Sequence, residues 1–407
     1  NFKIEDATVS FDFPNGYNES EVLIIDPNIT FSSFTGSTAD NWGMSATPDE
    51  NGNLFAGGVA FGAGYPTSIG VYDQTFNGGV VDVSIFKFTA DGTGMIYSTY
   101  LGGAGSETPN SMVCAPNGEL FIFGLTSSSN FPMAGTPYRS TFSGGPNLSA
   151  DANDLGFSQG SDLYIARLSA DGSTLLASTY MGGTSTDGLN ISSLKYNYGD
   201  QFRGEIVLDD LNNVYVSSTT RSSDFPTVNA IQATLSGPQD AVAFKMPPTL
   251  NSLLWSTYFG GIGTETGNSI QLSSTGDVYF VGGTTSMNLV FSSGQSLAYN
   301  GGIADGYAVH LNGTTGAMLS GTYIGMAEYD QVYCVQLDID DNVYVLGQTE
   351  SNWPITAGHY GVANSGQFIR KYNGSLTSVF WTTMVGAGTG HVEISPTAFL
   401  VSDCYDI

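Results

Sequence analysis

One short phrase recurs six times along this 407-residue chain, and it constrains the fold more than any other feature. The phrase reads Ser-Thr-Tyr-apolar-Gly-Gly or a close variant, and its central residue stands at positions 34, 100, 180, 258, 323 and 384, at intervals of 66, 80, 78, 65 and 61 residues. Regular self-similarity is typical of chains built from structural repeats that stack on one another. The six copies of this anchor phrase are SSFTGS at 32–37, STYLGG at 98–103, STYMGG at 178–183, STYFGG at 256–261, GTYIGM at 321–326 and TTMVGA at 382–387.

Each interval between two anchor phrases contains the same order of short apolar segments and turns. In the fourth interval, NSIQLSS, GDVYFVGGTTS and DGYAVHLN precede the anchor phrase. The segments alternate or run apolar over about five to eight residues, as strands do, and pairs such as TG, NG and DD between them are typical of tight turns. Four antiparallel strands per interval predict the blades of a β-propeller, because one blade cannot bury both of its faces alone.

We predict an all-β chain with five full blades of four antiparallel strands and the start of a sixth, and six or seven blades in the complete protein. The inner strands are expected near Trp42–Thr47, Asn110–Ala115, Gly204–Leu208, Asn268–Ser273, Gln331–Leu337 and Pro396–Val401. The third strands are expected at Asp82–Phe88, Asp162–Leu168, Asp240–Lys245, Asp305–Leu311 and Gln367–Tyr372. The anchor phrase then forms the fourth, outer strand of each blade.

The two ends of the chain carry separate predictions. The segment Ile29–Thr35 is a fourth strand with no three strands before it, so we expect it to complete the last blade and close the ring. Residues 1–28 do not fit the repeat, and their alternation predicts the end of a preceding β domain or a linker. Residues 29–407 are assigned to the propeller, which we expect to be truncated at its C-terminal end.

Charge and cysteine usage exclude several classes of partner and site. Ten basic against 37 acidic residues give a formal charge of −27, which repels the phosphates of nucleic acids. No stretch approaches the roughly 18 apolar residues of a membrane span, so no membrane insertion is expected. Cys114, Cys334 and Cys404 lie far apart without CxxC spacing, which argues against a disulfide framework or a zinc site. Cys114 and Cys334 are interpreted as small buried residues at equivalent positions of two inner strands.

No set of residues typical of catalysis stands out in the sequence. The three histidines, His310, His359 and His391, lack an HExxH pattern, and the chain has no Gly-x-Ser-x-Gly nucleophile elbow. Four glutamates follow anchor phrases and are expected near one rim: Glu107, Glu205, Glu265 and Glu328. We therefore expect no catalytic residues and no enzyme. The alternative is a carbohydrate-active enzyme in which two rim carboxylates, such as Glu265 and Glu328, act as acid and base about 5 to 10 Å apart.

Clustered aspartates leave calcium open as a ligand, although no cofactor is expected. The candidates are Asp338, Asp340 and Asp341 in DIDDN and Asp209 and Asp210 in LDDLNN. Oxygen ligands grouped in this way suit a hard cation. The same residue types are also what tight turns between strands prefer, because Asp and Asn tolerate left-handed geometry and bond their own backbone. No cluster has the full EF-hand pattern.

Two enlarged loops and a set of recurring aromatics complete the candidate features. The expansions lie at roughly residues 142–160 and 187–201, and each is either a functional loop on a rigid scaffold or a tolerated insertion. The recurring aromatics invite the interpretation of a ligand cage. A residue repeated at the same place in every blade is expected instead to pack between blades. The aromatics concerned are Tyr100, Tyr180, Tyr258 and Tyr323.

The repeat resembles a known bacterial family, the SBBP β-propeller repeat. The resemblance is carried by DLYIARLSADGSTLLASTYMGG at 162–183, NNVYVSSTTRSSDFPT at 212–227, NSLLWSTYFGG at 251–261 and GELFIFGLTSSSNFP at 118–132, and it covers about residues 29–407. Two departures are the loss of the third-strand aspartate in the fifth repeat, where Gly366–Gln367 stand, and Gly325–Met326 in place of the paired glycines.

Two segments near the ends also resemble a narrower group, the large surface proteins of Bacteroidetes that are gliding-motility-associated or type IX secretion substrates. These segments are FPNGYNESEVLIIDPNITFSSFTGSTADNWG at 13–43 and ISPTAFLVSDC at 394–404. This resemblance implies a non-catalytic secreted or cell-surface module, a scaffold for adhesion or for protein and glycan interaction. It implies an extracellular location or attachment to the outer-membrane surface of a Gram-negative bacterium. The implied partners are the type IX translocon or its shuttle proteins during export, and other surface proteins or glycans.

Overall fold

The computed structural model describes residues 31–150, 155–197, 199–393 and 395–402, together with the backbone of two short strands near the start of the chain. The chain divides into two units, Asn1–Phe34 and Thr35–Ile407. In the first unit, β1 (Phe2–Glu5) and β2 (Thr8–Phe11) pair antiparallel, with Phe2 opposite Phe11. The second unit contains all the repeats. In the described residues no helix is long and apolar enough to cross a membrane.

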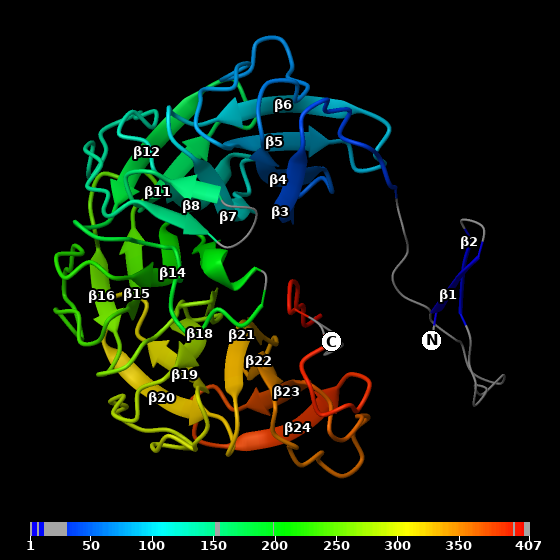
Figure 1. The fold of residues 1–407 in the computed structure, drawn as a ribbon, viewed down its shortest axis with the longest axis vertical. Helices are drawn as coiled ribbons and strands as arrows, with labels where there is room; N and C mark the ends of the chain where they lie inside the picture. The colour runs from blue at the N-terminus through cyan, green and yellow to red at the C-terminus, as the bar shows by residue number, and fades with distance from the viewer. Residues whose placement is uncertain are drawn as a thin grey trace. The chain divides into compact units, whose positions relative to one another are not determined.

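The second unit consists of five four-stranded antiparallel sheets that follow one another around a common centre, which is the architecture of a β-propeller (Figure 1). Blade 1 contains β3 (Asn41–Pro48), β4 (Leu54–Ala60), β5 (Asp82–Phe88) and β6 (Met95–Leu101). Blade 2 contains β7 (Glu107–Cys114), β8 (Leu120–Thr126), β11 (Asp162–Leu168) and β12 (Leu175–Met181). Blade 3 contains β13 (Glu205–Leu208), β14 (Val214–Thr220), β15 (Asp240–Met246) and β16 (Trp255–Phe259). Blade 4 contains β17 (Ser269–Leu272), β18 (Val278–Thr284), β19 (Asp305–Leu311) and β20 (Met318–Ile324). Blade 5 contains β21 (Asp330–Leu337), β22 (Val343–Thr349), β23 (Gln367–Tyr372) and β24 (Val379–Val385).

The predicted five full blades are therefore confirmed, with their four strands in the predicted order. Three further short elements lie in the enlarged loops of the chain: β9 (Leu148–Ala150) and β10 (Leu155–Phe157), which pair with each other, and the 3₁₀ helix η1 (Asp200–Phe202). Both enlarged loops thus contain ordered structure of their own.

Blade 2 shows how the alternation of a strand buries two faces. On β11, Tyr164 belongs to the same apolar cluster as Ile85 of blade 1, whereas the next residue, Ile165, belongs to the cluster that contains Phe244 of blade 3. Successive side chains of a strand point to opposite faces, so a blade between two others is apolar on both. This is why the second and third strands read as nearly continuous apolar runs in the sequence.

The tyrosine of the anchor phrase ties the outer strand to a loop of its own blade. The Tyr180 hydroxyl donates to the carbonyl of Ser128 at 2.7 Å and accepts from the amide of Phe131 at 2.9 Å. The ring itself is buried between blades 1 and 2, as predicted for a packing residue. The same hydroxyl bonds recur at Tyr100, Tyr258 and Tyr323.

A sixth repeat begins after β24. In blade 2, the carboxylate of Glu107 accepts the amide of Gly103, just after the anchor phrase, at 2.9 Å. After blade 5, Glu393 accepts the amide of Ala387 at 2.7 Å in the same way. The described residues 31–40 and 395–402 contain no strand, and the remainder of the predicted closing strand Ile29–Thr35 lies outside the described residues. Closure of the ring therefore stays a prediction.

Candidate functional site

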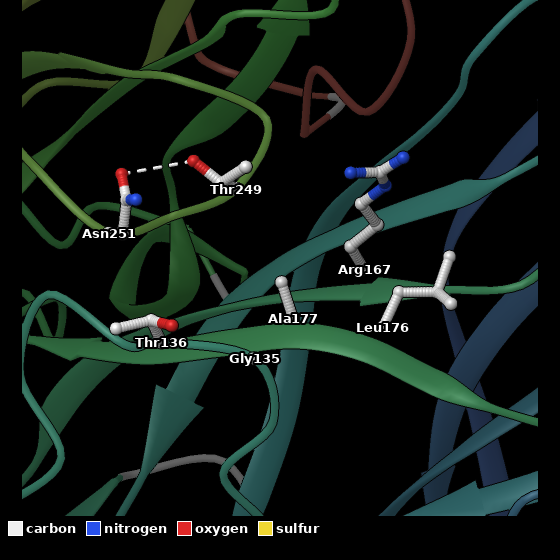
Figure 2. A pocket seen from close by; sticks show the side chains of 7 residues that line it. All are labelled: Gly135, Thr136, Arg167, Leu176, Ala177, Thr249 and Asn251. Atoms are coloured by element: carbon white, nitrogen blue, oxygen red, sulfur yellow. Dashed lines mark hydrogen bonds between the residues drawn. The ribbon is translucent and has the colours of Figure 1, made fainter.

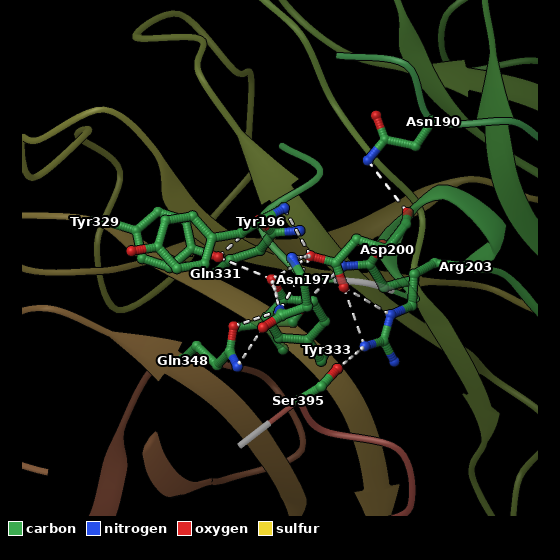
Figure 3. Close-up of polar contacts among 12 residues, drawn as sticks. Asn190, Tyr196, Asn197, Asp200, Arg203, Tyr329, Gln331, Tyr333, Gln348 and Ser395 are labelled. Carbon is green, nitrogen blue, oxygen red and sulfur yellow. Dashed lines mark hydrogen bonds and ion pairs between the residues drawn. The ribbon is translucent and has the colours of Figure 1, made fainter. Parts of the chain in front are cut away.

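The enlarged loop between blades 2 and 3 crosses to blade 5 and forms a cluster of polar contacts with it (Figure 3). We call this segment, residues 187–203, the crossing loop. Its centre is the fully buried Asp200 at the start of η1. The Asp200 carboxylate accepts from the amides of Tyr196 and Asn197 at 2.9 and 2.6 Å and from the Tyr333 hydroxyl of β21 at 3.0 Å. It also pairs with Arg203 at 3.1 Å.

Three further contacts fasten the crossing loop to blade 5. Tyr196 stacks on Tyr329 with ring centroids 4.2 Å apart. The Asn197 side-chain amide donates to the Gln348 side chain at 2.6 Å and accepts from it at 3.1 Å. These contacts join distant parts of the sequence. Tyr196 is 133 residues from Tyr329, and it is 154 residues from Glu350, which its hydroxyl also contacts. Ring stacking and paired hydrogen bonds therefore act together on the loop, and they hold it in one conformation.

Arg203 ends the crossing loop and faces several partners at once. Its guanidinium lies over the ring of Tyr333, 4.7 Å from the centroid, and donates to the Ser395 hydroxyl at 3.4 Å. Ser395 lies beyond blade 5, directly before Pro396–Val401, which was predicted as the inner strand of the sixth repeat but forms no strand in the structure. Arg203, whose side chain is 16% exposed, therefore connects the crossing loop to blade 5 and to the chain beyond it.

In three blades a side chain of the inner strand joins it to the inner strand of the next blade. Ser45 accepts the amide of Met112 at 3.1 Å, and Ser269 accepts the amide of Val335 at 3.1 Å. In blade 3 the same position holds Glu205, which accepts the Ile270 amide at 3.0 Å. Burial raises the pKa of Glu205. The predicted rim glutamate Glu205 is thus an internal acid of the propeller.

The cysteines do not occupy equivalent positions, contrary to the prediction. Cys334 pairs with Leu346 and stands where Ser45 and Ser269 stand, whereas Cys114 pairs with Leu120 at the last position of its strand. Both strands carry a bulge at the same place, so the register is shared, and the cysteines differ because Cys334 is the fifth residue of β21 whereas Cys114 is the eighth residue of β7. Both thiols are free, and burial raises the pKa of Cys334 to about 12. Cys404 lies outside the described residues.

The aspartates proposed for calcium organise tight turns. Asp338 accepts from the amides of Asp340 and Asn342 at 3.0 and 2.9 Å, and it pairs with Lys371 at 2.7 Å. Although burial raises its pKa, the bonds from Lys371 and Asn342 hold the pKa of Asp338 below the usual value. Asp209 is arranged in the same way, with the amides of Leu211 and Asn213 at 3.0 and 2.8 Å and with Lys245 at 3.5 Å.

The remaining calcium candidates are placed differently. Asp210 is exposed, and so is Asp340. Asp341 accepts from the amide and the hydroxyl of Ser274 in blade 4 at 2.7 and 2.6 Å, so it joins two blades. Within the described ranges no three His, Cys, Asp or Glu side chains are grouped closely enough to hold a metal ion together. Calcium at these turns stays a prediction.

The turn aspartates belong to a unit that recurs in all five blades. In each blade a basic residue of the third strand lies over an aromatic of the second strand and pairs with a carboxylate of the turn between the first two strands. The five units are Lys87 over Phe55 with Asp49, Arg167 over Phe121 with Glu119, Lys245 over Tyr215 with Asp209, His310 over Tyr279 with Asp277, and Lys371 over Tyr344 with Asp338. The recurrence indicates a structural role.

This unit also accounts for one of the three histidines. His310 stands where the other blades have lysine or arginine, and burial lowers its pKa. His359 stacks on Trp381 with centroids 5.2 Å apart, and His391 is exposed. The three histidines therefore lie in three different settings and do not converge.

The rim glutamates are not one set either. Glu107 and Glu265 are fully buried at equivalent positions between blades, where Glu265 accepts from Thr284 at 2.6 Å and from the Gly261 amide at 2.9 Å. Glu328, which the alternative hypothesis pairs with Glu265, is exposed. Asp187 and Asp330, which the sequence analysis missed, occupy the same position as Glu107 and Glu265. The sequence does contain a pattern that identifies this position, because each acid stands four residues after the second glycine position of an anchor phrase.

Each of these acids faces a second buried carboxyl, the aspartate that begins the third strand of the preceding blade. We call the two a junction pair. The first glycine of the anchor phrase separates them: a Cβ on Gly102 would lie 2.5 Å from Asp82 Oδ1 and 2.9 Å from Glu107 Oε2. This close approach explains why the anchor phrase carries glycine there. The other junction pairs are Asp162 with Asp187, Asp240 with Glu265 and Asp305 with Asp330.

Burial makes the junction pairs weak acids. It raises the pKa of Asp187 to about 8 and those of Glu265 and Asp330 to about 7. In an unfolded chain these groups titrate near pH 4. The native state therefore binds protons more tightly, and the stability linked to them is fully present below about pH 4 and is lost as the pH rises through their native pKa values.

We accordingly expect the melting temperature, measured by calorimetry with a chelator present, to be about 5 °C lower at pH 8 than at pH 5. Asp187→Asn removes one of the raised pKa values, so its melting temperature should depend less on pH over that interval. An unchanged melting temperature between pH 5 and pH 8, or a variant with the slope of the unchanged protein, would contradict the assignment.

A shallow surface pocket lies between blades 2 and 3, away from the crossing loop (Figure 2). Its lining includes Arg167, Leu176 and Ala177 of blade 2 and Thr249 and Asn251 of the turn after β15. Arg167 is already paired with Glu119 at 2.5 Å and donates to the carbonyl of Pro248 at 3.1 Å. The pocket is open and carries no unpaired charge among the residues that line it.

Comparison with known proteins does not assign the chain to a family. No protein-family model and no curated protein matches the chain. Among solved structures it is similar to a protein of unknown function from Dyadobacter fermentans, with 11% identity over 86% of this chain and 84% of that one and a TM-score of 0.39. The Dos1 propeller has 9% identity over 88% and 76%, with a TM-score of 0.35. NanB sialidase from Streptococcus pneumoniae has 8% identity over 89% and 64%, with a TM-score of 0.43. The chain is a β-propeller protein.

Proposed function

We propose that this chain is a non-catalytic propeller module that binds another macromolecule at the face where the crossing loop meets blade 5. The observation that carries the proposal is the rigid mounting of Tyr196, which stacks on the buried Tyr329 yet remains 39% exposed. Its hydroxyl donates to the exposed Glu350. An aromatic side chain held in one orientation costs little entropy on binding, which is why such residues dominate interaction surfaces.

The way in which the acids are bonded favours a scaffold role for this module over a catalytic role. Asp200, Glu205 and Glu265 are each engaged by backbone or side-chain donors that hold the fold together. The resemblance to SBBP repeats and to type IX secretion substrates supports a location outside the cell or on the outer-membrane surface. On this proposal the partners are other surface proteins or glycans, and the type IX translocon during export. The export route would be abandoned if the complete protein lacked a C-terminal sorting domain.

Binding and turnover can be measured together on one panel of neutral polysaccharides. Neutral glycans are the suitable probe because the charge of −27 disfavours anionic ones. We expect binding in biolayer interferometry without release of reducing ends, and Tyr196→Ala should weaken that binding about tenfold. Leu211→Ala, an exposed residue of a turn in blade 3, is the matched control and should leave binding unchanged.

Turnover would overturn the proposal. If reducing ends accumulated and Glu328→Gln abolished their release, the carbohydrate-active alternative would replace the scaffold. If binding occurred but Tyr196→Ala left it unchanged, the module would bind through another surface, and the assignment of this face would be wrong.

A further inference from the structure

One position of the outer strand differs between blades, and the difference leaves a space between blades 2 and 3. This position stands three residues before the tyrosine position of the anchor phrase and lies opposite the basic residue of the third strand. We call it the wedge position. Blades 1, 3 and 5 have a large aromatic there, whereas blade 4 has serine and blade 2 has alanine. In blade order the residues are Tyr97, Ala177, Trp255, Ser320 and Trp381.

In blades 1 and 3 the wedge aromatic packs against the next blade, at the turn between its third and fourth strands. Tyr97 is buried, and a Cβ on Gly172 of blade 2 would lie 2.6 Å from its ring. Trp255 is buried as well, and a Cβ on Gly316 of blade 4 would lie 3.0 Å from its indole. A ring at the wedge position therefore fills the space beside this turn.

Trp255 also makes a polar contact with that turn. Its indole Nε1 donates to the carbonyl of Gly313 at 3.0 Å. The ammonium of Lys245 donates to the same carbonyl at 3.2 Å. Because a carbonyl oxygen has two lone pairs, it accepts both donors. Gly313 is the second residue after β19, which identifies the corresponding carbonyl in the other blades.

Between blades 2 and 3 the same arrangement lacks its ring. The corresponding carbonyl belongs to Pro248, the second residue after β15, and it accepts from the Arg167 guanidinium at 3.1 Å. Among the described residues no second donor reaches this carbonyl. Ala177, Thr249 and Asn251 line a pocket of about 210 Å³ at this place (Figure 2). The pocket is thus the space that an indole fills one blade further on.

Blade 4 also lacks a wedge aromatic, but another ring takes over the contact there. The hydroxyl of Tyr279 donates to the carbonyl of Gly374, the second residue after β23, at 2.7 Å. In blade 2 the residue that corresponds to Tyr279 is Phe121, which has no hydroxyl. At the junction of blades 2 and 3, neither an indole nor a phenol therefore reaches the carbonyl.

We propose that the pocket between blades 2 and 3 binds a neutral aromatic ring that carries an N–H or O–H donor, such as an indole or a phenol. An engineered cavity of about 150 Å³ holds benzene in another protein, so the volume suffices for a ring. Arg167, which lines the pocket, is paired with Glu119 and does not require an anion, while its guanidinium suits an aromatic neighbour. The donor of the ring would bond the Pro248 carbonyl. This pocket is separate from the binding face of the proposed function.

Isothermal titration calorimetry of the full chain with two probes tests the pocket. The first probe is indole, for which we expect one site with a dissociation constant of about 1 mM. The second probe is the peptide Gly-Ser-Trp-Ser-Gly, with leucine in place of tryptophan as its control. Tighter binding of the tryptophan peptide would show that the ring comes from a partner protein. Binding of indole alone would show that it comes from a small molecule, and either result supports the pocket.

Variants at the wedge position give a matched comparison. Ala177→Trp introduces the residue of blade 3, so it should fill the pocket, abolish indole binding and raise the melting temperature by about 2 °C. Ala177→Ser introduces the residue of blade 4 and should leave indole binding unchanged. If Ala177→Trp does not fold, Asn251→Trp narrows the pocket from an exposed turn and should weaken indole binding at least about tenfold.

Two results would overturn the proposal. The first is that neither indole nor the tryptophan peptide binds, which would mean that the pocket holds solvent alone. The second is that indole binds equally well to the unchanged protein and to the variant that blocks the pocket. Tyr196→Ala separates this proposal from the proposed function, because it should weaken glycan binding and leave indole binding unchanged.

Discussion

Asp200→Ala should destabilise the propeller by about 3 to 5 kcal/mol, the largest effect of any single side chain in the crossing loop. The substitution leaves the guanidinium of Arg203, whose side chain is 16% exposed, without its carboxylate at 3.1 Å. It also leaves the amides of Tyr196 and Asn197 and the Tyr333 hydroxyl without their acceptor. Unsatisfied buried donors carry the full cost of desolvation. The measurement is the free energy of unfolding from urea denaturation.

The matched control for this prediction is Asp210→Ala, which removes an exposed carboxylate ten residues further along the chain. Its free energy of unfolding should change by less than about 0.5 kcal/mol. Hydrogen exchange of the Tyr196 and Asn197 amides adds a local readout, because both donate to Asp200 and both should exchange faster in Asp200→Ala. Equal stabilities of the two variants would mean that the crossing loop contributes nothing to the fold.

Gly102→Ala should cost about 3 kcal/mol, although alanine is usually a mild replacement. The added methyl group would lie 2.5 Å from Asp82 Oδ1 and 2.9 Å from Glu107 Oε2, and both side chains are fully buried. Neither carboxyl can move away without breaking its bonds to Asn77 or to Thr126 and Ser128. Denaturation of the variant by urea measures the loss.

Gly43→Ala is the control for the glycine prediction, because a Cβ at Gly43 would meet no atom within 4 Å. Its free energy of unfolding should stay within about 0.5 kcal/mol of the unchanged protein. A Gly102→Ala variant as stable as Gly43→Ala would show that the junction pair is looser than the structure has it. The glycine that recurs at this place of the anchor phrase would then need another explanation.

Much of the fold follows from the sequence because each repeat supplies the same local signals. The third strands Asp82–Phe88, Asp162–Leu168 and Asp305–Leu311 were predicted with the bounds that β5, β11 and β19 have. An aspartate begins each of them and a turn follows each. The inner strand of blade 2 was placed three residues late, because its bulge between Pro109 and Ser111 interrupts the alternation.

The crossing loop could not be predicted, because its partners lie far away in the sequence. One hydrogen bond joins Asp200 to Tyr333, which lies 133 residues away in the sequence, and no local sequence pattern predicts this contact. The sequence indicated only that this segment is enlarged, and left open whether it is a functional loop or a tolerated insertion. Contacts of this kind depend on where the blades stand around the centre, which repeat spacing alone does not give.

The acids were the least predictable part of the candidate site. Glu107 and Glu265 were expected on a solvated rim, yet both are buried. Sequence reasoning treated acidity as a surface property, whereas the backbone amides and hydroxyls of the anchor phrase create an internal position for a carboxyl. The repeats carry Glu at 107 and 265 but Asp at 187 and 330, so the recurrence of an acid at this position was not recognised in the sequence.

An experimental structure of the whole protein, determined by crystallography in the presence of calcium, tests the central claim most directly. The account predicts that the crossing loop lies against blade 5, with Asp200 bonded to Tyr333 and Arg203 and with Tyr196 stacked on Tyr329. That result would support a rigid scaffold with an exposed binding face. A crossing loop folded back on blade 3, leaving Glu205 and Arg203 open to a ligand at the centre of the propeller, would contradict it and point to chemistry there.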